Sequence, residues 1–311
     1  MKTQFKNVIE ILDYYKSEEK CKQLLIQQRW NGKPACPHCA SEKVYITDRG
    51  YKCANKECYK KFSVISGSIF ENTKIKLRYW FAAIYLITAH KKGISSHQLA
   101  KDLGVTQKTA WFILQRVRAM LKDKAPQMLS SVVEIDETYV GGKAGNKHAK
   151  ERKKLREKGT GYIDKAMVFG ILERQGKVFT QVVPANDGKV LKPIILDKVK
   201  EGAIVMTDGF GAYKGLDKLK GFQHEVVNHH QGEYFREGFH TNSIEGYWSI
   251  FKRGIIGIYH YVSPKHLHRY CDEFTYRYNT RHITDNDRFI SALTNADGVR
   301  LKYTELTKII N

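Results

Sequence analysis

The sequence predicts a multidomain chain in which small N-terminal domains precede an α/β domain with a mixed sheet. Three patterns predict this order: two close pairs of cysteines, apolar residues at helical spacing from residue 75 to about residue 121, and alternating strand-like segments from residue 132 onward. The segment 125–131 breaks the helical pattern and marks the main boundary. We expect an N-terminal helical segment at 1–30, a cysteine-rich domain at 31–70, a helical domain at 71–124 and the α/β domain at 130–311.

The charge balance indicates the class of partner. The chain of 311 residues has 53 Lys and Arg against 32 Asp and Glu, a net charge of +21. An excess of this size favours a polyanion, because each phosphate neutralised by Lys or Arg releases a condensed counterion. Nucleic acid is therefore the leading partner, and a membrane surface is the alternative. With 42% hydrophobic and 27% charged residues, the composition is that of a globular protein and not of a disordered or fibrous one.

The membrane alternative finds little support in the sequence. The longest nearly uncharged apolar stretch covers residues 79–89, whereas a helix that crosses a membrane needs about 20 such residues. The N-terminus places charged residues between its apolar ones and has no secretory signal pattern. We therefore expect no membrane partner and a cytoplasmic protein.

Four of the six cysteines form a pattern typical of a zinc site. They lie in two close pairs, Cys36 with Cys39 and Cys53 with Cys58. Two such pairs can present four thiolates to one structural Zn²⁺ in a tetrahedral arrangement. The alternating segments beside the pairs are typical of short strands, so the sequence predicts a zinc ribbon. Disulfides are the alternative, which a reducing cytosol disfavours.

The helical domain contains a helix-turn-helix pattern. A helix from about residue 95 is followed by a turn at Gly104 and by a second helix that Thr106 caps. In this arrangement three exposed residues at the start of the second helix are placed to read bases: Gln107, Lys108 and Thr109. A plain helical hairpin is the alternative, since short helices joined by a glycine turn are common. The charge of the chain and the adjacent cysteine pairs favour DNA binding.

The segment after residue 130 mixes strands with helices. Strand patterns at 132–140, 165–173 and 178–183 indicate an antiparallel meander, and a helix at about 190–200 leads to a buried strand at 203–207. Three antiparallel strands, a helix and a further strand form an α+β or mixed α/β pattern. This order of elements fits an RNase H-like core.

Three acidic residues occupy positions where carboxylates meet in such a core. Asp136 lies in the first strand, Asp208 ends the later strand, and Glu245 lies on a helix near the C-terminus. Carboxylates so placed can hold two Mg²⁺ ions, which activate an attacking oxygen and stabilise the leaving oxygen in phosphodiester displacement. Each also has a simpler explanation. Asp136 can be an exposed strand carboxylate, Asp208 can begin a turn before glycine, and Glu245 can form a capping box with Asn242.

Read in order, these motifs resemble bacterial insertion-sequence transposases of the DDE superfamily, in the group with an N-terminal zinc ribbon. The resemblance rests on the cysteine pairs, on residues 93–111, and on Glu134-Ile-Asp-Glu-Thr-Tyr-Val-Gly-Gly, Thr207-Asp-Gly and His240-Thr-Asn-Ser-Ile-Glu-Gly-Tyr-Trp. It implies that Asp136, Asp208 and Glu245 are the catalytic triad and bind Mg²⁺ or Mn²⁺. It also implies that Lys252 contacts DNA near the cleaved phosphate. Asn242 stays open as the alternative third ligand, because some relatives have Asn at that position.

The resemblance also implies an activity. The chain is expected to be a DNA transposase that binds the terminal inverted repeats of an insertion sequence and catalyses metal-dependent cleavage and strand transfer. Its partner is then double-stranded DNA, both the ends of the element and the target, with a homo-oligomer assembled on DNA at the bacterial nucleoid. Two alternatives are a zinc-ribbon regulator whose RNase H-like domain is inactive and an RNase H-like nuclease without strand transfer.

A basic loop follows the first strand of the predicted core. Four of its cations are Lys150, Arg152, Lys153 and Lys154. A solvated charge run is the ordinary explanation of such a loop. Contact with the DNA backbone is favoured in this chain, because the loop follows the strand that carries Asp136.

Several titratable residues near the triad have open roles. Glu134 should share the strand face of Asp136 and could assist it, and Glu137 crowds the same position. Four histidines that precede the third carboxylate could be core, phosphate-contacting or catalytic residues: His224, His229, His230 and His240.

Overall fold

The computed structural model describes residues 4–142, 148–149, 152–153, 165–227 and 240–308. The chain divides into two compact units. The first is Met1–Leu121 together with His282–Asn311, and the second is Lys122–Arg281. The predicted α/β domain of 130–311 therefore extends too far at its C-terminal end. The last segment joins the first unit because the ring of Phe289 packs against that of Phe81, with centroids 5.8 Å apart, and because Asn286 accepts the backbone N–H of Phe5.

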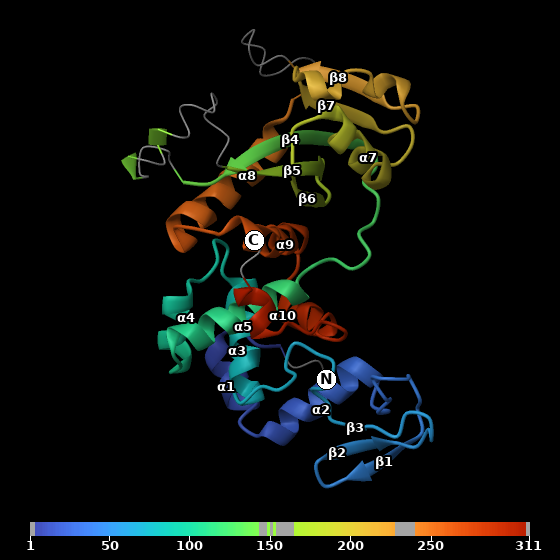
Figure 1. The fold of residues 1–311 in the computed structure, drawn as a ribbon, viewed down its shortest axis with the longest axis vertical. Helices are drawn as coiled ribbons and strands as arrows, with labels where there is room; N and C mark the ends of the chain where they lie inside the picture. The colour runs from blue at the N-terminus through green and yellow to red at the C-terminus, as the bar shows by residue number, and fades with distance from the viewer. Residues whose placement is uncertain (1–3, 143–147, 150–151, 154–164, 228–239, 309–311) are drawn as a thin grey trace. The chain divides into compact units, whose positions relative to one another are not determined.

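The first unit begins with two helices and a small sheet (Figure 1). Its elements are α1 (Val8–Tyr14), α2 (Glu18–Trp30), β1 (Val44–Thr47), β2 (Gly50–Cys53) and β3 (Lys61–Phe62). Asn7 and Ser17 cap the two helices, since each side chain accepts a backbone N–H of the first turn. The strands pair antiparallel in the order β1-β2-β3. The ring of Trp30 packs edge-on against Tyr51 and Phe62, so the end of α2 closes over this sheet.

The remaining helices of the first unit include the predicted two-helix pattern. They are α3 (Leu77–Ala89), α4 (Ser96–Leu103), α5 (Gln107–Met120), α10 (Asp285–Thr294) and α11 (Tyr303–Thr307). Gly104 joins α4 to α5 in a left-handed conformation with φ of 64°, which glycine adopts without strain. Thr106 caps α5 as predicted. The buried guanidinium of Arg116 donates to the main-chain oxygens of Ile69 and Leu301, which ties α5 to the C-terminal segment.

The second unit contains a mixed sheet, as the sequence predicts. The described strands are β4 (Val132–Val140), β5 (Ala166–Glu173), β6 (Val178–Val183), β7 (Ile204–Asp208) and β8 (Gln223–Val227). They lie in the order β6-β5-β4-β7-β8 (Figure 1). The pairs β4–β5 and β5–β6 are antiparallel, and β4–β7 and β7–β8 are parallel. The sequence did not predict β8. The central strand of the sheet is therefore β4, which carries the first predicted catalytic residue.

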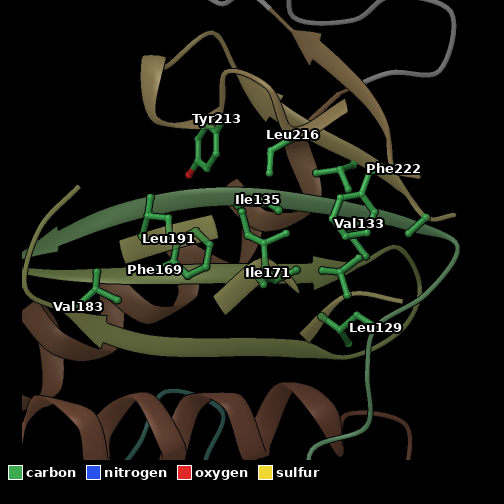
Figure 2. Packing of buried hydrophobic residues seen from close by; sticks show 14 of the residues in the cluster. Leu129, Val133, Ile135, Phe169, Ile171, Val183, Leu191, Tyr213, Leu216 and Phe222 are labelled. Carbon is green, nitrogen blue, oxygen red and sulfur yellow. The ribbon is translucent and has the colours of Figure 1, made fainter. Parts of the chain in front are cut away.

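Helices cover both faces of this sheet. One face is covered by α7 (Gly188–Lys198) and by the short helical segments η2 (Gly211–Tyr213) and η3 (Leu216–Lys218). Val133 and Ile135 of β4 pack there with residues of β5 and with Leu191 of α7, as Figure 2 shows. The other face packs against α8 (Asn242–Gly254), η5 (Ile255–Tyr259) and α9 (Pro264–Asn279). Because side chains alternate along a strand, Glu134 and Asp136 point away from α7 and toward the α8 face.

Candidate active site and zinc centre

The four predicted zinc ligands lie together in the first unit. Their sulfur atoms all lie within 4.8 Å of one another. The Sγ atoms of Cys36 and Cys58 are 3.8 Å apart, and those of Cys39 and Cys53 are 3.5 Å apart. Four sulfurs at about 2.3 Å from a tetrahedral zinc ion are about 3.8 Å from one another. The cluster therefore fits a structural zinc ion.

The pairing of β4 with β7 brings the two aspartates level with each other. Residues Val132, Val133 and Glu134 pair with Ile204, Val205 and Met206 in parallel register. Continuing this register by two residues places Asp136 beside Asp208. Neighbouring strands lie about 4.8 Å apart, and paired residues point to the same face. The side chains of Asp136 and Asp208 are both half-buried.

Helix α8 carries Glu245 above the same face of the sheet. Ile244 and Trp248 bury the apolar side of the helix, while Glu245 is exposed. Gly170 of β5 pairs directly with Asp136. A Cβ atom at Gly170 would lie 2.5 Å from the ring of Trp248, so only glycine allows this helix to approach the strand so closely. The absence of a side chain at Gly170 thus sets the distance of α8 from the aspartates.

The carboxylates act on one another through their charges. Burial, followed by the charges of Glu137, Asp208 and Glu245, raises the pKa of Asp136 to about 7. A bound cation would relieve this repulsion, and oxygen ligands suit Mg²⁺ and Mn²⁺, so the residues fit a divalent metal. Within the described part of the chain the four cysteines are the one group of metal-ligand side chains that converges within 4.8 Å. The three carboxylates lie near one another, but their oxygen atoms do not all converge within that distance.

Glu134 connects the strand of Asp136 to the helix of Glu245. Its carboxylate is fully buried, and Oε2 accepts the backbone N–H groups of Ser243 and Ile244 at 2.8 and 2.9 Å. Thr241, rather than the expected Asn242, is the N-cap residue of α8, and its side chain makes no capping bond. The cap is therefore supplied from β4, since a carboxylate at a helix N-terminus satisfies unpaired N–H groups and interacts favourably with the helix dipole.

Arg174 neutralises this buried carboxylate. Its Nε donates to Oε1 of Glu134 at 2.8 Å, and its terminal nitrogen donates to the main-chain oxygen of His240 at 2.8 Å. Nδ1 of His240 lies 3.5 Å from the same Oε1. The turn after β5, the strand β4 and the segment before α8 thus share one hydrogen-bonded network. Of these residues the sequence indicated Glu134, by its position two residues before Asp136, and His240, as one of the histidines that precede Glu245. It gave no sign of Arg174.

Glu137 belongs to the opposite face of β4. Its Oε2 accepts the hydroxyl hydrogen bond of Tyr213, with the two oxygens 2.6 Å apart. Burial raises the pKa of both groups above their ordinary values. Glu137 therefore does not compete with Asp136 for the same space. It instead fixes the segment that follows Asp208, on which Tyr213 lies.

Comparison with known proteins agrees with this arrangement of two sites. Residues 128–279 match the ISXO2-like transposase domain, and residues 16–61 match the transposase zinc-ribbon domain. The chain is 34% identical over 252 residues to an uncharacterized protein in transposable element ISH50 of Halobacterium salinarum, which covers 76% of this chain and 83% of that protein. The chain belongs to the ISXO2-like transposase family. It is also 35% identical over 108 residues to an uncharacterized transposase-like protein of Haemophilus influenzae, which covers 34% of this chain and 85% of that protein.

Membership of the ISXO2-like transposase family confirms the predicted resemblance and the predicted fold class. The zinc-ribbon match ends at residue 61 and contains all four cysteines. The transposase match contains β4 to β8 and all of α8 and α9. In the described segments no helix is long and apolar enough to cross a membrane.

The three residues predicted to read bases already have partners within the first unit. Nε2 of Gln107 donates to Oγ of Ser96 at 2.8 Å, and the hydroxyl of Thr109 lies 2.9 Å from that of Thr106. Nζ of Lys108 lies 5.1 Å from the centroid of the Tyr303 ring. All three are at the start of α5, where Gln107 and Lys108 are exposed and Thr109 is half-buried.

The predicted cations of the second unit are only partly described. Arg152 and Lys153 are exposed, whereas Lys150 and Lys154 lie outside the described residues. Lys252 is exposed on α8. It shares an exposed stripe with three other polar residues of that helix, Asn242, Glu245 and Ser249.

The histidines separate into different environments. His224 lies on β8, and its Nε2 is 2.8 Å from the hydroxyl of Thr207. Burial lowers the pKa of His224 below its ordinary value, so this ring is neutral and links two strands. His240 joins the network of Glu134. His229 and His230 lie outside the described residues.

Proposed function

We propose that this chain is a DDE transposase that binds the terminal inverted repeats of an insertion sequence and catalyses metal-dependent DNA cleavage and strand transfer. One observation carries the proposal: the register of β4 and β7 places Asp136 beside Asp208, and the charge of Glu245 acts on the same site. A carboxylate whose pKa is raised by burial and by neighbouring carboxylates is typical of a functional site, and a site of this kind suits cations. Membership of a transposase family supports a role for this site in transposition.

The three carboxylates would hold the catalytic metal ions. Asp136 would contact both ions, Asp208 one of them and Glu245 the other. Bound Mg²⁺ or Mn²⁺ supplies activation of an attacking oxygen and charge stabilisation of the leaving oxygen in phosphodiester displacement. The hydroxyl of Thr241 donates to Oε1 of Glu245 at 3.3 Å, which orients that carboxylate in the absence of other ligands.

Other residues of the second unit position and assist this site. The Glu134 network and Gly170 hold α8 at a fixed distance from β4. Lys252 is exposed on the same side of α8 as Glu245 and would contact a phosphate near the site of cleavage. Arg152 and Lys153 are exposed and available for the DNA backbone.

The first unit is proposed to recognise the DNA. Gln107, Lys108 and Thr109 begin α5, which follows the turn at Gly104 in the manner of a recognition helix. Base reading would require Gln107 to exchange its bond with Ser96 for one to a base edge. The zinc ribbon adds a second folded surface to this unit. The partners are the double-stranded ends of the element and the target, and we expect a homo-oligomer when the chain assembles on DNA.

A cleavage and joining assay tests the proposal. The substrate is a duplex that carries the terminal inverted repeat found beside the gene, incubated with the zinc-loaded chain and Mg²⁺. We expect nicked and joined products from the wild type and neither from Asp136→Asn. Binding without nicking would support the alternative of a regulator. Nicking without joined products would support a nuclease that does not transfer strands.

A further inference from the structure

A cationic groove lies on the α7 side of the sheet, lined in part by the segment that follows Asp208. It lies between the first turns of α7 and the segment that follows β7, with a volume of about 780 Å³. Lys189 and Lys192 of α7 line one side, and Phe210 and Lys214 line the other. Phe210 follows Asp208 by two residues, and its backbone N–H donates to Oδ1 of Asp208 at 3.1 Å. One wall of the groove therefore begins two residues after Asp208 and is tied to its carboxylate, although the carboxylates themselves point to the other face of the sheet.

The walls of the groove are held in place by packing and hydrogen bonds. A Cβ atom at Gly188 would lie 2.8 Å from the main-chain oxygen of Ala212, so the start of α7 contacts the opposite wall at this point. Nζ of Lys192 donates to the main-chain oxygen of Lys214 at 2.6 Å and bridges the two walls. The hydroxyl of Tyr213 fixes the same segment to Glu137. The groove is thus a feature of the folded unit and not a gap between loose segments.

The charge of the groove suits a polyanion. In the described part of the chain, neither Lys189 nor Lys214 pairs with a carboxylate, and both are exposed. Asp187 is the one acidic residue in the lining, and its carboxylate accepts the backbone N–H of Lys189 as the cap of α7. Two ammonium groups are therefore available for a ligand. Phosphates along a nucleic acid strand are the polyanion that a cationic groove beside a phosphodiester-cleaving site would meet.

Phe210 adds an aromatic surface at the edge of the groove. Its side chain is 42% exposed, and its ring contacts Tyr213 edge-on with centroids 6.3 Å apart. An exposed aromatic ring beside cations is typical of sites that stack an unpaired base while lysines contact the backbone. A duplex offers no free base face for such stacking except where its strands separate.

We propose that this groove binds one strand of DNA next to the phosphate that is cut, with Lys189 and Lys214 on its phosphates and Phe210 stacked on an unpaired base. The proposal rests on the proposed function, because it places the groove beside Asp208 as a catalytic residue. It assigns to this face of the second unit a DNA contact separate from the basic loop after β4.

DNA binding by the full-length, zinc-loaded chain tests this proposal. All measurements use an Asp136→Asn background, so that cleavage does not interfere. The probes are a blunt terminal-repeat duplex and the same duplex with a short single-stranded extension. The variants are Lys189→Ala/Lys214→Ala and Phe210→Ala. The matched control is Lys200→Ala/Lys265→Ala, which removes the same charge from exposed positions of the second unit outside the groove.

We expect the groove variant to reduce the slope of log Kd against log salt by about two, because each phosphate contact contributes about one. The control should leave the slope nearly unchanged. Phe210→Ala should weaken binding of the extended duplex about tenfold and leave the blunt duplex unaffected. Thermal unfolding of each variant checks that the second unit is folded.

Equal slopes for the groove variant and the control would overturn the proposal. So would an unchanged affinity of Phe210→Ala for the extended duplex. A mononucleotide that binds to the wild type and is lost in the groove variant, without any effect on DNA, would assign the groove to a small molecule instead. Failure of the proposed function is distinguishable, since it appears as absence of cleavage by the wild type in a separate assay.

Discussion

The two candidate metal centres of this chain are built in opposite ways. The zinc ligands lie within one short stretch, from Cys36 to Cys58, and their sulfur atoms already converge within 4.8 Å. The carboxylates come from Asp136, Asp208 and Glu245, on two strands and a helix that are far apart in the sequence. Burial, followed by the charges of neighbouring carboxylates, raises the pKa of Asp136. The first centre is closed and suits a structural ion. The second is open, and its carboxylates repel one another, as expected where a metal ion takes part in catalysis.

The largest expected effect is on the zinc centre. In Cys53→Ser the ribbon should lose its zinc and its fold, because binding of a structural zinc ion contributes about 10–16 kcal/mol in small domains. Elemental analysis should give one zinc per wild-type chain and none in the variant. Cys21→Ser is the matched control, since Cys21 is equally buried and lies outside the cluster. An unchanged zinc content in Cys53→Ser would refute the predicted centre.

The next largest effect concerns the open centre. Asp208→Asn should lower DNA cleavage on the order of a thousandfold while leaving the fold and DNA binding nearly unchanged, because a bound metal supplies several kcal/mol of charge stabilisation. Glu225→Gln on the neighbouring strand β8 should retain activity. Single-turnover cleavage and DNA affinity measure the two properties separately. Comparable losses in the two variants would mean that general negative charge, and not a specific ligand, supports activity.

A smaller effect is expected from Glu134, whose hydrogen bonds connect β4, the strand of Asp136, to α8, the helix of Glu245. Glu134→Gln should reduce cleavage about 10- to 100-fold, the range seen when groups that orient metal ligands are removed. It should also raise the Mg²⁺ concentration needed for half-maximal activity, because α8 loses its fixed position. Amide hydrogen exchange at Ser243 and Ile244 should become faster.

Glu273→Gln is the control for that experiment. Glu273 is also fully buried, and it pairs with Arg277 within α9. Its neutralisation should lower thermal stability without changing the Mg²⁺ requirement. If Glu134→Gln and Glu273→Gln show the same Mg²⁺ requirement as the wild type, Glu134 has a structural role only.

The smallest effect is the pH dependence that Asp136 contributes to the stability of the second unit. The pKa of Asp136 is about 7 in the folded chain, against about 3.9 when unfolded. Between these values the native state binds more protons, so without metal the free energy of unfolding falls as pH rises from about 4 to about 7. Asp136→Asn should remove one to a few kcal/mol of this decrease. Urea unfolding at about pH 5 and about pH 8 measures it, and parallel curves for the two proteins would exclude the predicted coupling.

The comparison also explains what the sequence could predict. The zinc centre is local, so the spacing of its cysteines was sufficient. The strands of the two aspartates were predictable, because the first has an alternating pattern and the second is a short apolar run that ends at Asp208. The sequence could not establish the pairing of β4 with β7, which depends on the register of strands that are distant in the chain.

The supporting residues of the open centre were harder to predict. Gly170 has a recognisable signal, since a glycine within a strand often marks close approach of another element, but its partner Trp248 comes from a distant helix. Arg174 follows β5 and gave no signal of its own. The capping box of Asn242 and Glu245, which the sequence allowed as an alternative, is not formed. The backbone N–H groups of Ser243 and Ile244 instead donate to the buried carboxylate of Glu134 on β4. The C-terminal segment was misassigned because the contact of Phe289 with Phe81 is also non-local.

Mn²⁺ binding measured by electron paramagnetic resonance tests the central claim most directly. The zinc-loaded chain should bind Mn²⁺ at the open centre, and binding should be strongly weakened in Asp136→Asn, Asp208→Asn and Glu245→Gln while being retained in Asn242→Ala. Normal binding in Glu245→Gln with loss in Asn242→Ala would contradict the account, since the third ligand would then be Asn242. Equal binding by all the variants would place the metal outside these carboxylates altogether.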